Sequence, residues 1–233
     1  MDLERGARPL VWRDRTWGFV ANVGVLVQAG DKNRFGVTYL SAVDLDFQDT
    51  PRFTGLGPGL GAILANPSGL NLGMTVPQSV MISGHQQLND QWAIMAYAGW
   101  QDWSQFGNVQ VGVEGGSTTT ANLKSQDIWH GAIGAQYQGS EQWLFSGGVA
   151  FDRSAVNNAN RTITLPVGQN WRFDLGAQYQ ISESVNLGAA YEFMWGGNLP
   201  VDPGTDGPLR GRVAGVYEDT WLYFFTLNLT WKF

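Results

Sequence analysis

The sequence predicts an all-β fold, an antiparallel transmembrane β-barrel of which this chain supplies about nine strands. Three observations carry this prediction. Residues 221–233 alternate strictly between apolar and polar, the apolar face of that segment is aromatic at both ends, and the connections between strands are alternately short and long. Strict alternation places successive side chains on opposite faces of a strand, and aromatic girdles mark the two interfaces of a membrane.

The terminal segment, residues 221–233, shows this pattern most fully. Leu227 and Leu229 lie in the middle of its apolar face, with aromatic residues on both sides. The apolar face comprises Trp221, Tyr223, Phe225, Leu227, Leu229, Trp231 and Phe233. Aliphatic residues between two aromatic ends are expected of a strand that crosses a bilayer.

The composition fits such a barrel. Only 15% of the 233 residues are charged, compared with about 25% in typical soluble domains. Apolar runs nevertheless stay far below the roughly 18 residues that a membrane helix needs. The net charge of −6 disfavours nucleic acid as a partner. Cysteine is absent, which excludes disulfides and thiolate metal sites, and nothing in the sequence points to a cofactor or a metal.

The same alternation predicts the other strands. They are expected at residues 17–29, 34–47, 77–88, 91–103, 127–138, 142–152, 171–181 and 185–195. Short turns are expected at 30–33, 89–90, 139–140 and 182–183. Long loops are expected at 48–76, 104–126, 153–170 and 196–217, with residues 109–113 as a candidate strand extension. Tight periplasmic turns opposite long extracellular loops are typical of outer-membrane barrels.

The strand count bears on how much of a barrel this chain contains. Nine is odd, whereas single-chain bacterial barrels close with an even number of strands. We therefore expect residues 1–233 to be a single, partial barrel domain, the carboxy-terminal portion of a larger barrel. Residues 1–5 are charged and no apolar stretch follows them, so a signal peptide is expected to have been cleaved or to lie upstream. A soluble β-sandwich is the alternative fold, and the regular alternation of connections disfavours it.

Three stretches resemble the family of long-chain fatty-acid and aromatic-hydrocarbon transporters of the FadL/TodX type. The first is WGFVANVGVLV at residues 17–27 together with RFGVTY at 34–39, and the second is QWAIMAYAGWQDWSQF at 91–106. The third is FDRSAVNNANRTITLP at 151–166, where Ala155 replaces the family's usual proline. With the terminal Phe233, these stretches cover nearly the whole chain in the family's order.

The resemblance implies a 14-stranded barrel whose lumen is closed by an amino-terminal hatch. It also implies that extracellular loops capture hydrophobic molecules, which pass through a pocket in the barrel and leave by a side opening. Measured against this resemblance, the hatch and about five leading strands are expected to lie outside residues 1–233. The family carries a ligand-contacting lysine near the position of Lys124.

Charged residues on the inward face are candidate ligand contacts. Arg172 and Asp174 alternate inward on one strand, and Glu192 does so on the next. A lumen cation can hold a fatty-acid carboxylate by a charge-assisted hydrogen bond. The alternative is an ion-pair ladder that only satisfies the charges of the wall.

Further candidates are His85 and His130, which also alternate inward. A structural role is the alternative for both, because two histidines without further ligands do not define a metal site. The loop around Asn160, Arg161 and Pro166 is expected to fold through local hydrogen bonds. The apolar stretch 56–72 is either a hydrophobic capture surface or an ordinary packed loop.

The predicted function is uptake of hydrophobic small molecules across the bacterial outer membrane. No nucleophile elbow or phosphate loop is present, so the chain is not expected to be an enzyme. A general diffusion porin and a structural or adhesive barrel are the alternatives. The expected partners are a hydrophobic ligand, outer-membrane lipid, and the barrel-assembly machinery acting through the strand that ends at Phe233.

Overall fold

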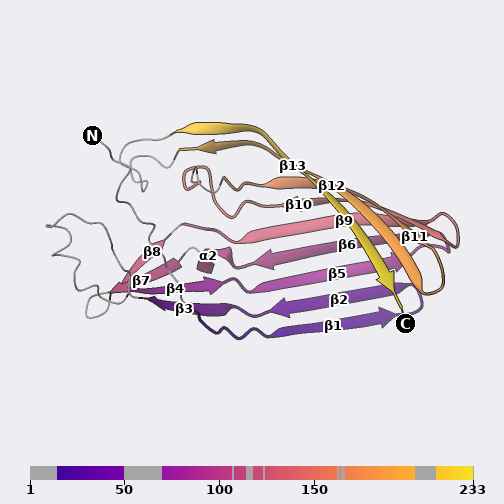
Figure 1. Cartoon of the computed structure of the whole chain (residues 1–233), viewed down its shortest axis with the longest axis horizontal. Helices are drawn as coiled ribbons and strands as arrows, with labels where there is room; N and C mark the ends of the chain where they lie inside the picture. The colour runs from indigo at the N-terminus through magenta and orange to yellow at the C-terminus, as the bar shows by residue number, and fades with distance from the viewer. Residues whose placement is uncertain are drawn as a thin grey trace, which may run out of the picture.

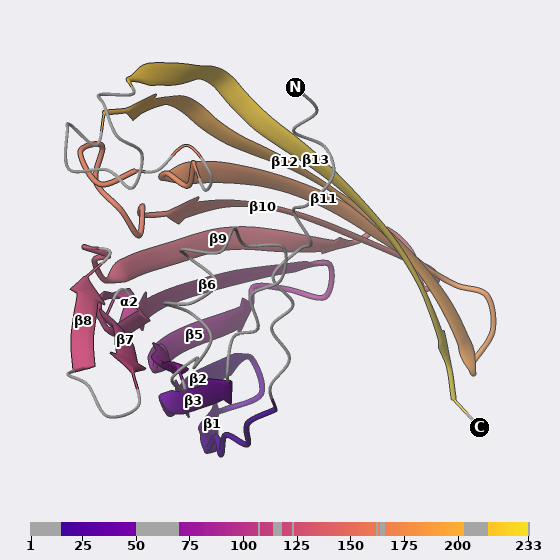
Figure 2. The same cartoon turned by 60° about the vertical axis from the view of Figure 1, so that its left-hand side comes forward.

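The chain folds into one large curved sheet with a smaller sheet at one end (Figure 1). The computed structural model describes residues 15–49, 70–106, 108–113, 118–122, 124–161, 163, 166–202 and 214–232. In the turned view the large sheet curves into a trough (Figure 2). The prediction of an antiparallel all-β fold is confirmed, and the described strands form an incomplete barrel.

The large sheet contains nine strands in the order β1-β2-β5-β6-β9-β10-β11-β12-β13, with every neighbouring pair antiparallel. The strands are β1 (Asn22–Ala29), β2 (Asn33–Leu40), β5 (Ser79–Gln87), β6 (Trp92–Gln101), β9 (Ile128–Gln138), β10 (Trp143–Asp152), β11 (Asn170–Gln180), β12 (Val185–Val201) and β13 (Gly215–Trp231). This matches the expected number of strands. The strands of this sheet follow one another in sequence order, but β3 and β4 lie in the chain between β2 and β5, and β7 and β8 lie between β6 and β9.

The smaller sheet corrects the prediction in three places. It consists of β3 (Val43–Asp49), β4 (Leu70–Val76), β7 (Asn108–Val113) and β8 (Thr118–Asn122), in that order. The expected strand 34–47 is therefore broken at residues 41–42 and enters both sheets. The predicted loops 48–76 and 104–126 contain strands, because the backbones of neighbouring wall strands continue to pair beyond the large sheet. Residues 50–69, which hold most of the candidate capture stretch 56–72, lie outside the described part.

Three of the short turns share one local design. Each turn follows a glutamine that ends a strand, in the sequences QLNDQW, QGSEQW and QISESV at residues 87–92, 138–143 and 180–185. The side-chain oxygens of Asn89, Ser140 and Ser182 accept hydrogen bonds from backbone N–H groups of the following strand. The glutamine amides donate to backbone carbonyls two residues later. These side chains satisfy backbone groups that a tight turn would leave unpaired.

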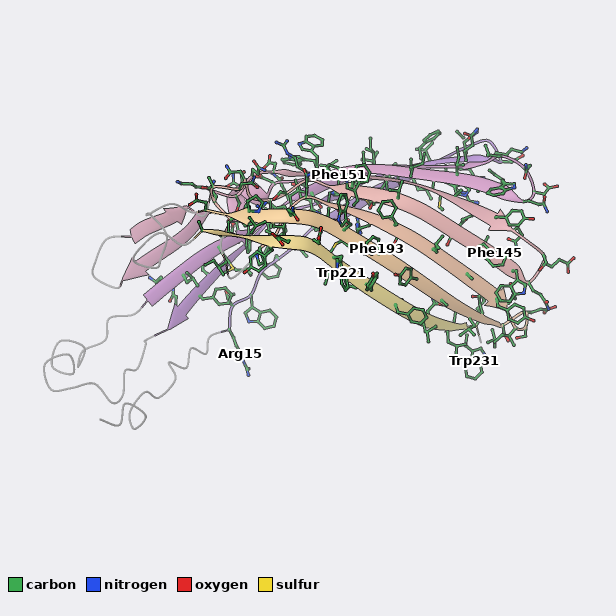
Figure 3. All side chains as sticks on the ribbon, turned by 90° about the horizontal axis from the view of Figure 1, so that it is seen from above. Arg15, Phe145, Phe151, Phe193, Trp221 and Trp231 are labelled. Atoms are coloured by element: carbon green, nitrogen blue, oxygen red, sulfur yellow. The ribbon has the colours of Figure 1, made fainter. Side chains whose placement is uncertain are left out.

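The outward face carries two aromatic belts, as the sequence predicts. Phe151, Trp171, Trp195 and Trp221 are direct cross-strand neighbours in one row across β10 to β13. A second belt comprises Trp92, Tyr137, Trp143, Phe145, Tyr179 and Trp231. Figure 3 shows Phe145 and Trp231 near the end with the short turns, while Phe151 and Trp221 lie farther along the sheet.

The spacing of the belts fits a membrane. Trp221 and Trp231 are ten residues apart on β13 (231 − 221), or roughly 33 Å at about 3.3 Å per residue. A strand tilt of about 40° reduces this span to roughly 25 Å, the height of the apolar band of outer-membrane barrels.

Apolar side chains on this face stay uncovered within the chain. Leu175, Leu227 and Leu229 are each about two-thirds exposed, at 68%, 67% and 66%. Among the described residues the buried apolar side chains are Ala93, Ala150, Leu199 and Val201. One curved layer of strands has no second layer to pack against, so its apolar face is suited to contact lipid.

The last two strands run farther than predicted. β12 continues to Val201 and β13 begins at Gly215, so both extend past the aromatic belt. Their pairing is irregular between Trp195 and Leu199, where Gly197 has a φ of 62°. Glycine adopts this left-handed conformation without steric cost, which permits the bulge.

Candidate ligand-binding wall

Strand register brings the predicted charged residues together on the inward face. Asp174 on β11 lies directly opposite Glu192 on β12, and Arg172 lies two residues from Asp174 on the same face. The prediction that these three side chains share one surface is confirmed. β10 supplies a third carboxylate, Asp152, to the same surface.

Arg172 is the centre of this cluster. Its Nε atom lies 2.9 Å from Oδ2 of Asp152, and its Nη2 donates hydrogen bonds of 3.3 Å to Oδ1 of Asp152 and to the Tyr97 hydroxyl. The Nε contact is an ion pair that lacks the alignment of a hydrogen bond. Oε2 of Glu192 is 3.9 Å from Nη1, at the outer limit of an ion pair. The guanidinium therefore has partners on β10 and β12, which flank β11, and on β6, three strands away in the sheet.

Asp152 and Tyr97 were missed as site residues by the sequence analysis. Alternation along β10 places Asp152 inward, but only the register across the hairpin shows that it meets Arg172. Tyr97 lies 75 positions from Arg172 in the sequence, and no local pattern links them. From the sequence alone, alternation shows only that both side chains face inward.

The cluster contains more acidic side chains than basic ones. One guanidinium faces three carboxyl groups, Asp152, Asp174 and Glu192. Asp174 and Glu192 are also direct cross-strand neighbours, a position in which like charges repel. Arg172 thus stabilises the acidic groups of the wall and has no positive charge in surplus for an anionic ligand.

His130 lies beside this cluster and packs over a glycine. It is opposite Asp152 on β10 and opposite Gly99 on β6. Its ring stands edge-on to Tyr97, with 5.8 Å between ring centroids. A Cβ added at Gly99 would overlap the imidazole ring, so Gly99 provides the space that His130 fills. Its inward orientation is as predicted.

His85 lies elsewhere on the inward face, four strands away from β11. It is paired with Arg34 on β2 and with Met95 on β6. Its Nδ1 atom is buried and has no hydrogen-bond partner in the described part of the chain. Alternation predicts only that both candidate histidines face inward. The structure shows that His85 and His130 lie in different parts of the inward face.

Lys124 is apart from both groups. It precedes β9, is exposed, and has a φ of 54°. It does not line any of the three cavities described below. Its expected role as a ligand contact gains no support from its position.

Two of these cavities lie along the inward face. The first, of about 600 Å³, extends from β1 to β11 and is lined by Leu26, Arg34, Gly36, Ser83, His85, Met95, Tyr97, Gly134, Gly148, Asp174 and neighbouring small residues. The second, of about 870 Å³, lies nearer the long loops and includes His130, Asp152, Met194 and Leu222. Both volumes are in the range of small-molecule sites.

The third cavity, also about 870 Å³, lies at the rim under the loop 153–169. Arg161 there is only 3% exposed. Its Nε donates to the Val167 carbonyl, and its Nη1 donates to Asn158 Oδ1 and to the Pro200 carbonyl. Burial lowers the pKa of the Arg161 guanidinium from its ordinary value. The prediction that this loop folds through local hydrogen bonds is confirmed, with one further bond to β12.

These features define a class of protein. A curved antiparallel sheet with aromatic belts and lipid-facing aliphatic residues outside, and charged and small residues inside, is the wall of a transmembrane β-barrel. Within the described residues no helix is both long enough and apolar enough to span a bilayer.

The chain belongs to the family described as Outer membrane protein transport protein (OMPP1/FadL/TodX), whose model matches residues 11–233. It is 31% identical over 226 residues to the long-chain fatty acid transport protein of Escherichia coli O6:H1, a match that covers 91% of this chain and 49% of the relative. The expected membership in this family and location in the bacterial outer membrane are confirmed.

Solved structures agree with this fold. A FadL homologue of Pseudomonas aeruginosa superposes with a TM-score of 0.77 at 23% identity, over 92% of this chain and 52% of that one. The CymD monoaromatic hydrocarbon channel superposes with a TM-score of 0.60 at 17% identity, over 93% of this chain and 52% of that one. The chain thus spans about half the length of the relatives that it matches.

Proposed function

We propose that this chain forms part of the wall of an outer-membrane barrel that takes up hydrophobic small molecules. Relatives in the family are named for transport of long-chain fatty acids and of monoaromatic hydrocarbons. Because the chain spans about half of these relatives, transport is proposed for the intact barrel to which residues 1–233 contribute one partial domain.

The observation that carries the proposal is the inward-facing cavity of about 600 Å³. Its floor is made of glycine, alanine and serine, and larger apolar side chains such as Leu26 and Met95 stand at its sides. A hydrophobic molecule can lie against such a surface, because small residues leave room above the strands. A wide water-filled channel has no need of an apolar recess of this size.

The six candidate site residues have different proposed roles. We propose ligand contact for His85 and Asp174, because both line this cavity. Arg172, Glu192 and His130 are proposed to hold the wall in shape through the contacts described above. Lys124 remains a prediction that comes from the family resemblance. Transport is proposed without chemical conversion of the ligand, and therefore without catalytic residues or a cofactor.

Two further partners are proposed. Outer-membrane lipid would contact the two aromatic belts and the aliphatic residues between Trp221 and Trp231. The barrel-assembly machinery would recognise the terminal strand β13 (Gly215–Trp231). Phe233, at which the sequence analysis expects this strand to end, lies outside the described part of the chain.

Uptake and conductance measurements test the proposal. Cells that carry the intact protein should accumulate radiolabelled oleate or toluene faster than cells that lack it. The purified protein should show little ion conductance in planar bilayers. A large, steady, nonselective conductance would favour a diffusion porin, and unchanged uptake of every hydrophobic substrate would favour a structural or adhesive barrel.

A further inference from the structure

The cavity of about 870 Å³ at the rim, under the loop 153–169, lies on the outward side of the wall. Trp171 and Trp195 line it, and both belong to the outward aromatic row that crosses β10 to β13. Figure 1 shows that the connection from β10 to β11 lies at the end of the sheet opposite the short turns. Aromatic belts mark the level of the lipid head groups, and long loops mark the extracellular side. The cavity is therefore placed beside the head groups of the outer leaflet.

A cation, Arg153, stands at the side of this cavity. Pairing between β9 and β10 continues to Arg153, whose N–H donates to the Trp129 carbonyl. Arg153 is two residues from Phe151 and so lies on the same outward side of the sheet. Its side chain is exposed, and no ion pair joins it to a carboxylate within the described part of the chain. Its guanidinium can thus be reached by an anion from the membrane side.

A second cation, Arg161, lies deeper in the same lining and is only 3% exposed. Its hydrogen bonds within the described residues go to neutral oxygens, the Val167 and Pro200 carbonyls and the Asn158 amide. Among those residues no carboxylate lies within ion-pair distance of it. Buried charges in proteins are normally paired, so this guanidinium points to an anion in the cavity.

Three asparagine amides add hydrogen-bond donors to the lining. The Oδ1 atoms of Asn157 and Asn158 accept from Asn160 N–H and from Arg161 Nη1, and Oδ1 of Asn198 accepts from Asp219 N–H. Each amide oxygen is thus used within the chain. An asparagine amide has one oxygen acceptor and one NH₂ donor group, so the groups left to face a ligand are the NH₂ donors. Such a lining suits a ligand rich in acceptor oxygens.

The lining also has apolar surface and one carboxylate. Trp171 and Trp195 remain partly exposed, at 41% and 46%. Indole rings offer flat apolar surface against which the C–H face of a sugar ring can pack. Asp219 also lines the cavity and can accept hydrogen bonds from hydroxyl groups. Aromatic surface together with a few convergent polar groups is typical of small-molecule sites.

We propose that this rim cavity binds a phosphorylated sugar, with the phosphate at Arg153 and Arg161 and the sugar ring against Trp171 and Trp195. Guanidinium groups recognise phosphate through paired, charge-assisted hydrogen bonds. The glycolipid of the bacterial outer leaflet carries phosphorylated glucosamine in its head group, and basic pockets at head-group level bind such groups. The site lies outside the lumen and is separate from the ligand that the barrel takes up.

The test compares lipid A, which carries phosphorylated glucosamine, with enzymatically dephosphorylated lipid A. Competition against fluorescently labelled lipid A, with the intact protein in detergent, gives the ratio of the two dissociation constants. The phosphorylated form is expected to bind about tenfold more tightly, the difference that one or two hydrogen bonds between charged groups supply.

Two variants test the donors, and a third is the matched control. Arg153→Gln should lower the preference for phosphate several-fold, and the exposed position of Arg153 spares the fold. Asn157→Asp keeps the oxygen that accepts from Asn160 N–H but replaces the NH₂ donor with a negative oxygen, and should abolish the preference. Lys232→Gln removes an equal charge after β13, at the short-turn end, and should keep it.

A further pair of variants tests the sugar contact. Trp195→Leu should weaken binding of both forms of lipid A by a similar factor, because packing against the ring does not depend on phosphate. Trp221 is the next residue in the same aromatic row but does not line this cavity, so Trp221→Leu should leave both affinities unchanged.

The outcomes also identify the source of the sugar. With the preference intact, competition by free glucosamine 1-phosphate as effective as that by lipid A supports the site with a soluble ligand, and failure to compete supports it with the lipid. Equal binding of the two forms of lipid A, or a preference that survives in both Arg153→Gln and Asn157→Asp, overturns the proposal. Uptake of hydrophobic molecules is measured separately, so its failure overturns the proposed function and leaves this site standing.

Discussion

Arg172 on β11 and Asp152 on β10 form the shortest ion pair of the described wall, with 2.9 Å between Nε and Oδ2. The pair ties two strands that are joined by the long loop 153–169 rather than by a tight turn. About a quarter of each side chain is exposed, at 27% and 24%. Partial exclusion from water makes such a pair sensitive to the loss of one partner.

The first prediction concerns this pair. Arg172→Met should lower the free energy of unfolding by about 2 kcal/mol, because three carboxyl groups lose their counter-charge while partial exposure limits the penalty. The measurement is denaturant unfolding of the intact protein in detergent, followed by tryptophan fluorescence. Asp152→Asn, which leaves a hydrogen-bonding amide, should be milder. Equal stability of Arg172→Met and the unaltered protein would show that the cluster contributes nothing.

A second prediction concerns the space that Gly99 leaves for His130. Gly99→Ala should destabilise the protein by about 1–3 kcal/mol, because the added methyl group overlaps the imidazole ring. His130→Ala should remove most of that penalty in the double variant. The same unfolding measurement gives the coupling energy of the cycle. Strictly additive effects would mean that the ring moves aside at no cost.

A third prediction compares the two faces of β13. Leu227→Arg should cost about 2–4 kcal/mol in stability, because it places a charge at the middle of the lipid face. Thr226→Arg, one position away on the inward face, should cost far less. Folding into lipid vesicles, read from the shift of the folded band on unheated gels, compares the two variants. Similar losses for both would contradict the assignment of faces.

A fourth prediction concerns the repeated turn design. Asn89→Ala and Ser140→Ala should each cost about 1 kcal/mol, because each removes a side-chain oxygen that accepts backbone hydrogen bonds in a tight turn. The two turns share no residues, so the double variant should show the sum of both losses. Glu141→Gln, in the same turn as Ser140 but with no such bond, is the control. A loss in the control as large as in Ser140→Ala would refute the capping role.

The sequence alone determined the fold class, the face of each side chain and the positions of the short turns. These features depend on a period of two residues and on local turn chemistry, both of which are visible in residues such as Leu227, Leu229 and Asn89. The family resemblance followed from the same local stretches. Of the second sheet, the sequence indicated residues 109–113 as a candidate strand, which β7 confirms. It did not indicate β4, which pairs with β7 across a long stretch of chain, or β8, which pairs with β7 without a clear apolar period.

Only the tertiary structure decided which inward residues meet. Alternation places both Arg172 and Arg34 on the inward face. Register placed Asp152 and Tyr97 on Arg172, and placed Arg34 beside His85 at the edge of a glycine floor. The physical reason is that alternation fixes the face of a residue, whereas its neighbours depend on hydrogen-bonded pairing between strands far apart in the chain.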